Sequence, residues 1–163
     1  MIENIKNNNS GFLFIEIIIA IALVTIVFIT LLGIGALVIN VSGAIQKQTQ
    51  ADSLVKDEFE ALRNYRDGTT WATNGLGAVN TGSSNPYHMV ISSDKWALVS
   101  GVETTGIFTR KIIFDKVSRD ASGNIESTYN VSRNDADTIK VTVIITWLNK
   151  TLENVLYLTN WKQ

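Results

Sequence analysis

The chain has 163 residues, a formal net charge of −1 and no cysteine, and 45% of its residues are hydrophobic. This length suggests one compact domain with an appended segment. The nearly neutral charge gives no electrostatic reason to expect nucleic acid as a partner. The absence of cysteine excludes disulfides, cysteine-ligated zinc and a thiol nucleophile.

A long apolar run occupies the N-terminal third of the chain, from Phe12 to Ile39, and only Glu16 and two threonines interrupt it. As a helix, this run would span about 42 Å, whereas the core of a bilayer needs about 20 helical residues. We therefore predict that residues 12–39 cross a membrane. Lys6, ahead of the run, weakly favours a cytoplasmic N-terminus.

Two simpler interpretations of this run are a cleaved secretory signal and a plain membrane anchor. A secretory signal has a basic start and an apolar core of about 7–15 residues, but here the start is Asn-rich and the run is far longer. A plain anchor does not explain Glu16, because a carboxylate at membrane depth costs about 2.5–3.5 kcal/mol. No Lys, Arg or His occurs between Phe12 and Lys47, so a cationic partner for Glu16 must come from outside this helix.

Residues 11–16 read GFLFIE and resemble the processing motif of type IV prepilins and pseudopilins. In that family a prepilin peptidase cuts after the glycine, the new first residue is N-methylated, and a glutamate at the fifth mature position is the hallmark. The resemblance implies that residues 1–11 are a leader, that cleavage falls between Gly11 and Phe12, and that Glu16 takes part in assembly.

The physical chemistry of the motif fits this resemblance. Cleavage would create an α-amino group on Phe12 with an ordinary pKa near 8, which is mostly cationic at neutral pH. At about 4 Å and an effective dielectric of about 20, its attraction to Glu16 of a neighbouring subunit is about 4 kcal/mol. This is comparable to the insertion penalty, so we expect the pair to fix the stagger between subunits.

Gly33 and Gly35 lie near the end of the apolar run. Many family members have a proline at the twenty-second mature position, where the helix bends or melts, and Gly33 stands at that position here. Glycine costs about 1 kcal/mol relative to alanine inside a helix, so the two glycines are candidates for a site of helix melting. The alternative is close packing between helices through small residues.

The pattern changes between residues 40 and 67, which we expect to continue the same helix in amphipathic form. Apolar residues recur at helical spacing among charges, at Ala51, Leu54, Val55, Phe59, Leu62 and Tyr65. This stripe is predicted to face a sheet, and Asp67-Gly68 is a stop signal. Residues 60–67, followed by Trp71, resemble the end of this helix in PilV-like minor prepilins.

Residues 68–163 are predicted to form a β-rich extracytoplasmic domain. Thr69–Pro86 is rich in Gly, Asn, Ser and Thr and is predicted to be a loop, which we expect Trp71 to pin to the core. The expected strands are His88–Ser92, Trp96–Ser100, Phe108–Val117, Thr138–Trp147 and Val155–Trp161, with turns at residues 93–95, 120–124 and 148–151. The expected fold is α+β and pilin-like, with one long N-terminal helix on an antiparallel sheet.

Residues able to carry chemistry are sparse in this sequence. His88 is the only histidine, and no phosphate loop or zinc motif occurs. Asp120, Ser122, Asn124 and Glu126 alternate oxygen-bearing side chains, yet the full calcium loop is absent, so an ordinary turn is favoured there and at Asn134–Asp137. Arg63, Arg66 and Asp67 are interpreted as a solvated helix end. We therefore expect no enzymatic activity, no cofactor and no metal.

The function predicted from the sequence is that of a structural, minor subunit of a type IV pilus or a secretion pseudopilus. Its expected partners are other pilin or pseudopilin subunits, the prepilin peptidase and N-methyltransferase, the pilus assembly machinery and the membrane, without nucleic acid. We expect a single-pass protein of the cytoplasmic membrane whose domain is extracytoplasmic, and a periplasmic or extracellular filament after assembly. The alternative is a membrane-anchored binding or adhesion module that does not polymerise.

Overall fold

The computed structural model describes residues 10–162, with side chains from Leu13 onward. One helix, α1, runs from Ser10 to Gly68. The chain forms two compact units that divide between Lys47 and Gln48, so α1 contributes to both. The predicted single helix is confirmed, and it ends at the predicted Asp67-Gly68 stop.

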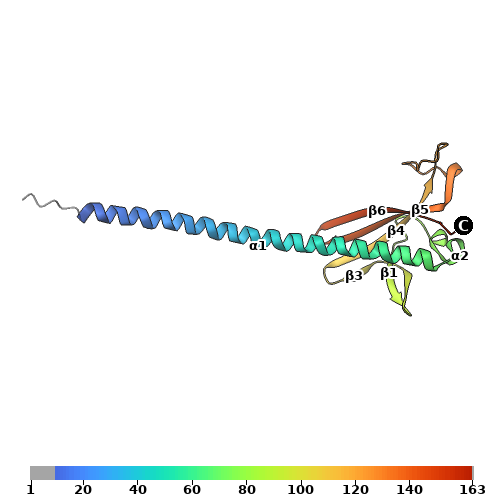
Figure 1. The fold of residues 1–163 in the computed structure, drawn as a ribbon, viewed down its shortest axis with the longest axis horizontal. Helices are drawn as coiled ribbons and strands as arrows, with labels where there is room; N and C mark the ends of the chain where they lie inside the picture. The colour runs from blue at the N-terminus through green and yellow to red at the C-terminus, as the bar shows by residue number, and fades with distance from the viewer. Residues whose placement is uncertain (1–9, 163) are drawn as a thin grey trace, which may run out of the picture. The chain divides into compact units, whose positions relative to one another are not determined.

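The second unit contains an antiparallel sheet with the strand order β2-β1-β4-β5-β6, and β3 pairs with β4 beside β1. The strands are β1 (Tyr87–Ser92), β2 (Lys95–Ser100), β3 (Glu103–Thr105), β4 (Phe108–Ser118), β5 (Asn134–Trp147) and β6 (Lys150–Thr159). The C-terminal part of α1 lies along one face of this sheet (Figure 1). The α+β arrangement predicted from the sequence is therefore confirmed.

The core lies between this part of α1 and the sheet. From the helix, Ala51, Val55, Ala61 and Leu62 are buried, as the spacing of the apolar stripe predicts. From the sheet, every second residue of β5 from Ile139 to Trp147 is buried on the same face. Ile112, Phe114, Met89 and Leu158 complete the cluster from β4, β1 and β6.

The segment between α1 and β1 is less irregular than predicted. It contains two short helices, α2 (Trp71–Asn74) and η1 (Leu76–Ala78), and Leu76 is fully buried. The indole of Trp71 packs against the core and donates a hydrogen bond from Nε1 to the carbonyl oxygen of Ala136 at 2.9 Å. A Cβ on Gly77 would lie 2.5 Å from this indole, so only glycine fits there. The predicted role of Trp71 as an anchor of the loop is confirmed.

The structure differs most from the prediction at β3, β5 and β6, whereas the ends of β1, β2 and β4 differ by one residue at most. Strand β6 begins at Lys150 and ends at Thr159, whereas Val155–Trp161 was expected. Its first half is polar, and it is a strand because its backbone pairs with β5 from Trp147↔Lys150 onward. Strand β5 likewise begins four residues before the expected Thr138, and β3 was not expected at all. In each case backbone pairing with a neighbour overrides weak local propensity.

Candidate functional site

Nothing in the part of the chain that the structure describes covers the N-terminal part of α1. All its large apolar side chains from Leu13 to Ile45 are exposed, on every side of the helix. By length and composition this helix can cross a membrane, and its most apolar stretch is not buried at all. The hydroxyl groups of its two threonines bind to the backbone of the same helix. Thr25 donates to the carbonyl oxygen of Ile21 at 2.7 Å, and Thr30 donates to that of Val27 at 2.8 Å.

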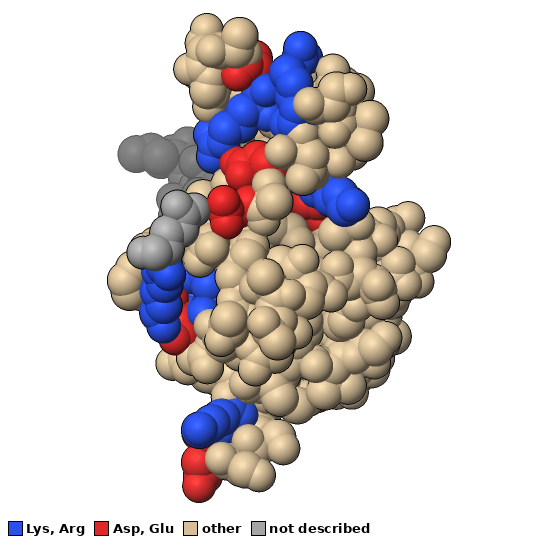
Figure 2. All heavy atoms as spheres, turned by 90° about the vertical axis from the view of Figure 1, so that its right-hand side faces the viewer, with Lys and Arg blue, Asp and Glu red and all other residues tan. Residues whose placement is uncertain are grey.

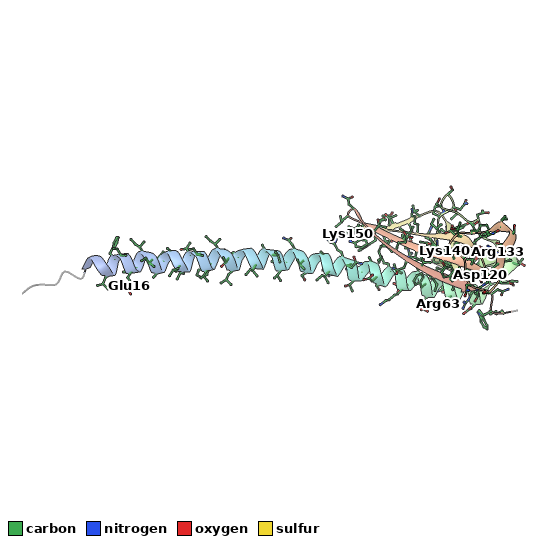
Figure 3. The ribbon with its side chains drawn as sticks, turned by 90° about the horizontal axis from the view of Figure 1, so that it is seen from above. Glu16, Arg63, Asp120, Arg133, Lys140 and Lys150 are labelled. Carbon is green, nitrogen blue, oxygen red and sulfur yellow. The ribbon has the colours of Figure 1, made fainter. Side chains whose placement is uncertain are left out.

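Glu16 is the exception in this apolar surface. It is exposed and projects from α1 near the helix start (Figure 3). Among the residues that the structure describes, no hydrogen bond or ion pair involves its carboxylate. Unlike the threonines, a glutamate cannot be satisfied by the carbonyl oxygens of its own helix, because an ionised carboxylate only accepts hydrogen bonds. Its partner must therefore come from outside the described part of the helix.

The other predicted residues of this segment lie in regular helix. Gly33 and Gly35 do not interrupt α1, and a Cβ added at either would meet nothing within 4 Å. No contact within the described chain requires these glycines, which leaves both the melting and the packing interpretation as predictions. Gly11 and Phe12 lie in the first turn of α1. The leader up to Asn9 lies outside the described residues.

In the candidate calcium-binding turn, groups of the turn itself form hydrogen bonds to the carboxylate of Asp120. Asp120 accepts hydrogen bonds from the backbone N–H groups of Ser122 and Asn124, both at 2.9 Å, and from the Asn124 side chain. These bonds lower the pKa of Asp120, with the backbone of Asn124 contributing most. Glu126 pairs with Arg133 instead of turning into the loop. Within residues 10–162, no group of three His, Asp or Glu residues is placed to hold a metal ion.

The remaining polar candidates also have structural partners. His88 Nδ1 lies 3.2 Å from the carbonyl oxygen of Gly101, and Asp135 pairs with Arg119 at 2.6 Å. The Asp67 carboxylate at the helix end accepts hydrogen bonds from Arg66 and from the indole of Trp161, and the Arg66 bond is the main reason that the pKa of Asp67 is lowered. A cleft of about 660 Å³ adjoins this helix end, but the polar groups named here bind one another.

One buried charged cluster was not predicted from the sequence. The side chain of Glu58 on α1 is only 1% exposed, and its Oε1 lies 2.6 Å from Nη1 of Arg110 on β4. Arg110 also pairs with Glu103 on β3 and donates from Nη2 to the carbonyl oxygen of Met89 at 3.2 Å. Burial raises the pKa of Glu58, and the nearby charge of Arg110 opposes this rise.

The signal for this cluster was present in the sequence. Glu58 lies four residues from both Leu54 and Leu62, in the middle of the apolar stripe of α1. Arg110 is in phase with Ile112 and pairs across the ladder with Ile145, so it points toward the helix. Two opposite charges that both occupy apolar positions predict a buried ion pair. This pair joins the helix to the sheet.

The chain matches no family model, no curated protein and no solved structure. What it does therefore has to be inferred from the residues themselves.

Proposed function

We propose that this chain is a structural, minor subunit of a type IV pilus or a type II secretion-like pseudopilus. The observation that carries the proposal is the single carboxylate of Glu16 in an apolar helix surface that nothing in the described chain covers. Lipid can cover the apolar side chains but cannot neutralise the carboxylate. A bundle of such helices can do both, provided that each Glu16 meets a cation.

The motif at residues 11–16 supplies that cation. Cleavage after Gly11 by a prepilin peptidase gives Phe12 a charged amino terminus, four residues before Glu16. Within one helix, four residues correspond to about 6 Å of rise. A neighbouring subunit shifted along the axis by about this amount brings its amino terminus level with Glu16. Contact between apolar helices replaces contact with lipid, so this pairing and close packing together drive assembly.

The fold supports the same proposal. A helix whose second half packs on an antiparallel sheet leaves its first half free to enter a bundle. The domain stays outside the membrane in this arrangement. Gly33 and Gly35, where an added Cβ would meet nothing within 4 Å in the described chain, allow close approach of a neighbouring helix or a local loss of helix during extraction from the membrane.

The proposal is tested by substituting Glu16 and measuring how much of the protein appears in sheared filaments compared with membranes. We expect Glu16→Gln, which keeps the shape and removes the charge, to abolish incorporation, since the amino terminus of the neighbour loses its partner. Thr30→Ala is the matched control, because the hydroxyl group of Thr30 donates to carbonyl oxygens of its own helix. Normal incorporation of Glu16→Gln would contradict the proposal and favour a membrane-anchored binding module that does not polymerise.

A further inference from the structure

Two neighbouring hairpins of the domain end in turns that carry large aliphatic residues. Strands β3 and β4 join through Gly106-Ile107, and β5 and β6 join through Leu148-Asn149. Two-residue turns of this kind favour Gly, Asn and Asp, because these residues tolerate positive φ and interact well with water. Ile107 is 45% exposed and Leu148 is 60% exposed. We call these two side chains the apolar tips.

Leu148 is unusual for a second reason. Its φ is +43°, a region in which a bulky side chain is a genuine outlier. The turn between β1 and β2 has the same backbone form, with φ of +51° at Ser93 and +60° at Asp94, but its residues are polar. The fold therefore accepts polar residues in this turn type. Strain combined with an exposed apolar side chain at Leu148 points to a function outside local folding.

The apolar tips lie beside each other. The last pairing between β4 and β5 is Thr109↔Thr146, which brings the two turns together at the same end of the sheet. Ile107 and Leu148 line a common hollow of about 410 Å³, and Lys150 is the only charged residue among those that line it. Beneath the tips, the rings of Phe108 and Trp147 pack with their centroids 5.9 Å apart. This aromatic pair adjoins both turns in sequence and supports the strand ends that carry the apolar tips.

The two ends of the domain differ in character. Within the domain, Lys150, next to the apolar tips, lies at the end where the domain's part of α1 begins, whereas Asp120 and Arg133 lie at the opposite end (Figure 3). That opposite end presents charged side chains of both signs over the segment between β4 and β5 (Figure 2). Here Arg119 pairs with Asp135, and Arg133 pairs with Glu126. The apolar tips thus lie at the end of the domain where its own part of α1 begins.

The connection between the apolar run and the domain is short. From Phe12 to Ile39 the helix rises by about 42 Å, which matches the thickness of about 40–45 Å of a bilayer with its headgroup layers. Residues 40–47, about two helical turns, connect this run to the unit that contains the sheet. No long linker therefore separates the domain from a membrane that the apolar run crosses.

We propose that the apolar tips Ile107 and Leu148 dock the domain on the surface of the bilayer that holds α1, with Lys150 contacting anionic headgroups. Aliphatic side chains beside a lysine suit the boundary between headgroups and acyl chains. This docking rests on the membrane span and not on filament assembly. It describes the subunit before assembly, and extraction from the membrane would release it.

The test uses the full-length chain in vesicles of phosphatidylethanolamine and phosphatidylglycerol that contain lipids with a nitroxide quencher at the headgroup level. The natural chain has no cysteine, so single cysteines can carry a fluorophore. The label goes on Asn149→Cys, next to Leu148, or on Asp94→Cys as a matched control. Both positions are the second residue of a two-residue turn, with φ of +63° and +60°.

We expect the label at position 149 to be quenched more strongly than the label at position 94, with blue-shifted emission, at every protein-to-lipid ratio. Adding Leu148→Asn to the first variant should reduce that quenching toward the control. Equal quenching at both positions would overturn the proposal. So would a blue shift at position 149 that disappears on dilution in lipid, because that result assigns the tips to a second copy of the chain. The outcome of this quenching experiment does not depend on whether Glu16→Gln blocks filament incorporation, so the two proposals can fail independently.

Discussion

The two halves of α1 are both rich in apolar residues, but they use them differently. In residues 48–68 the apolar side chains form a stripe that is buried against the sheet, and even Glu58 within that stripe has a partner, Arg110. In residues 13–47 the apolar side chains cover the whole helix and remain exposed, and Glu16 has no partner in the described chain. Residues 48–68 are covered within the chain, whereas nothing in the described chain covers the apolar side chains of residues 13–47.

This comparison shows that a buried charge and an exposed charge in apolar surroundings carry different information. Glu58 is explained by the chain that contains it, and its loss should affect stability. Glu16 is not explained by its own chain, and its loss should affect assembly. All four tryptophans lie beyond residue 70. Tryptophan fluorescence of the full chain in detergent therefore reports unfolding of the domain alone.

The largest expected effect on the free energy of unfolding comes from comparing the same phenylalanine-to-alanine change in the domain and in the apolar part of α1. Phe114→Ala removes a fully buried ring from the core and should lower the free energy of unfolding by about 3–5 kcal/mol. Phe28→Ala removes a ring that no part of the described chain covers and should change it by less than about 0.5 kcal/mol. Denaturant titration followed by tryptophan fluorescence measures both. Similar destabilisation by the two variants would mean that the apolar half is folded against the domain.

The next effect concerns the ion pair that joins the helix to the sheet. Arg110→Met leaves the carboxylate of Glu58 buried without its cation, which should cost about 3 kcal/mol at neutral pH. Combining it with Glu58→Leu should recover most of this loss, because the charge and its desolvation disappear together. The same titration measures the double-mutant cycle. If the double variant were as unstable as Arg110→Met alone, the destabilisation by Arg110→Met could not be assigned to the loss of the ion pair.

The pH dependence of stability should change in a defined direction when Glu58 is replaced. The pKa of Glu58 is raised in the folded domain above its ordinary value of 4.5, so the folded state binds its proton more tightly than the unfolded state. Its contribution to stability is therefore full below pH 4.5 and is lost as the pH rises through the folded-state pKa. Relative to Glu58→Gln, the natural chain should gain stability between pH 7 and pH 4.5. A constant difference over this range would contradict the assignment.

The smallest expected effect is at the apolar tips. Leu148→Asn replaces a bulky residue at positive φ by one that tolerates this conformation, and should stabilise the domain by about 0.5 kcal/mol. Ile107→Asn is the control, because Ile107 has no positive φ and should give no such gain. Thermal unfolding of the full chain in detergent resolves the two. Destabilisation by Leu148→Asn would show that Leu148 serves folding and not docking.

Much of the fold was predictable because the strongest sequence patterns, the long helical run and the alternating strand, correspond directly to structural elements. Unbroken helical sequence from the apolar run to Asp67 predicted a single helix, and the alternation from Ile139 to Trp147 predicted the buried face of β5. The first half of β6 was missed because Lys150-Thr151-Leu152-Glu153-Asn154 has little apolar pattern. Its strand state depends on backbone pairing at the sheet edge, which local sequence does not encode.

The two glutamates in apolar surroundings also differ in how readily the sequence reveals them. Glu16 was found from the sequence because it interrupts a long apolar run, where a carboxylate is conspicuous. Glu58 was missed because charged residues are frequent in an amphipathic helix, and its burial depends on Arg110, more than 50 residues later. Recognising it required comparing the phase of a helix with the phase of a strand. Leu148 escaped notice for a related reason, since a leucine in a turn becomes unusual only when its φ is known.

The most direct test of the proposed function is the intact mass of the protein isolated from the membranes and filaments of its natural host. We predict a chain that begins at Phe12, with the added mass of one methyl group on its amino terminus. That form supplies the cation that Glu16 lacks. A functional protein that retains Met1 would contradict the account, because no new amino terminus would then lie near Glu16.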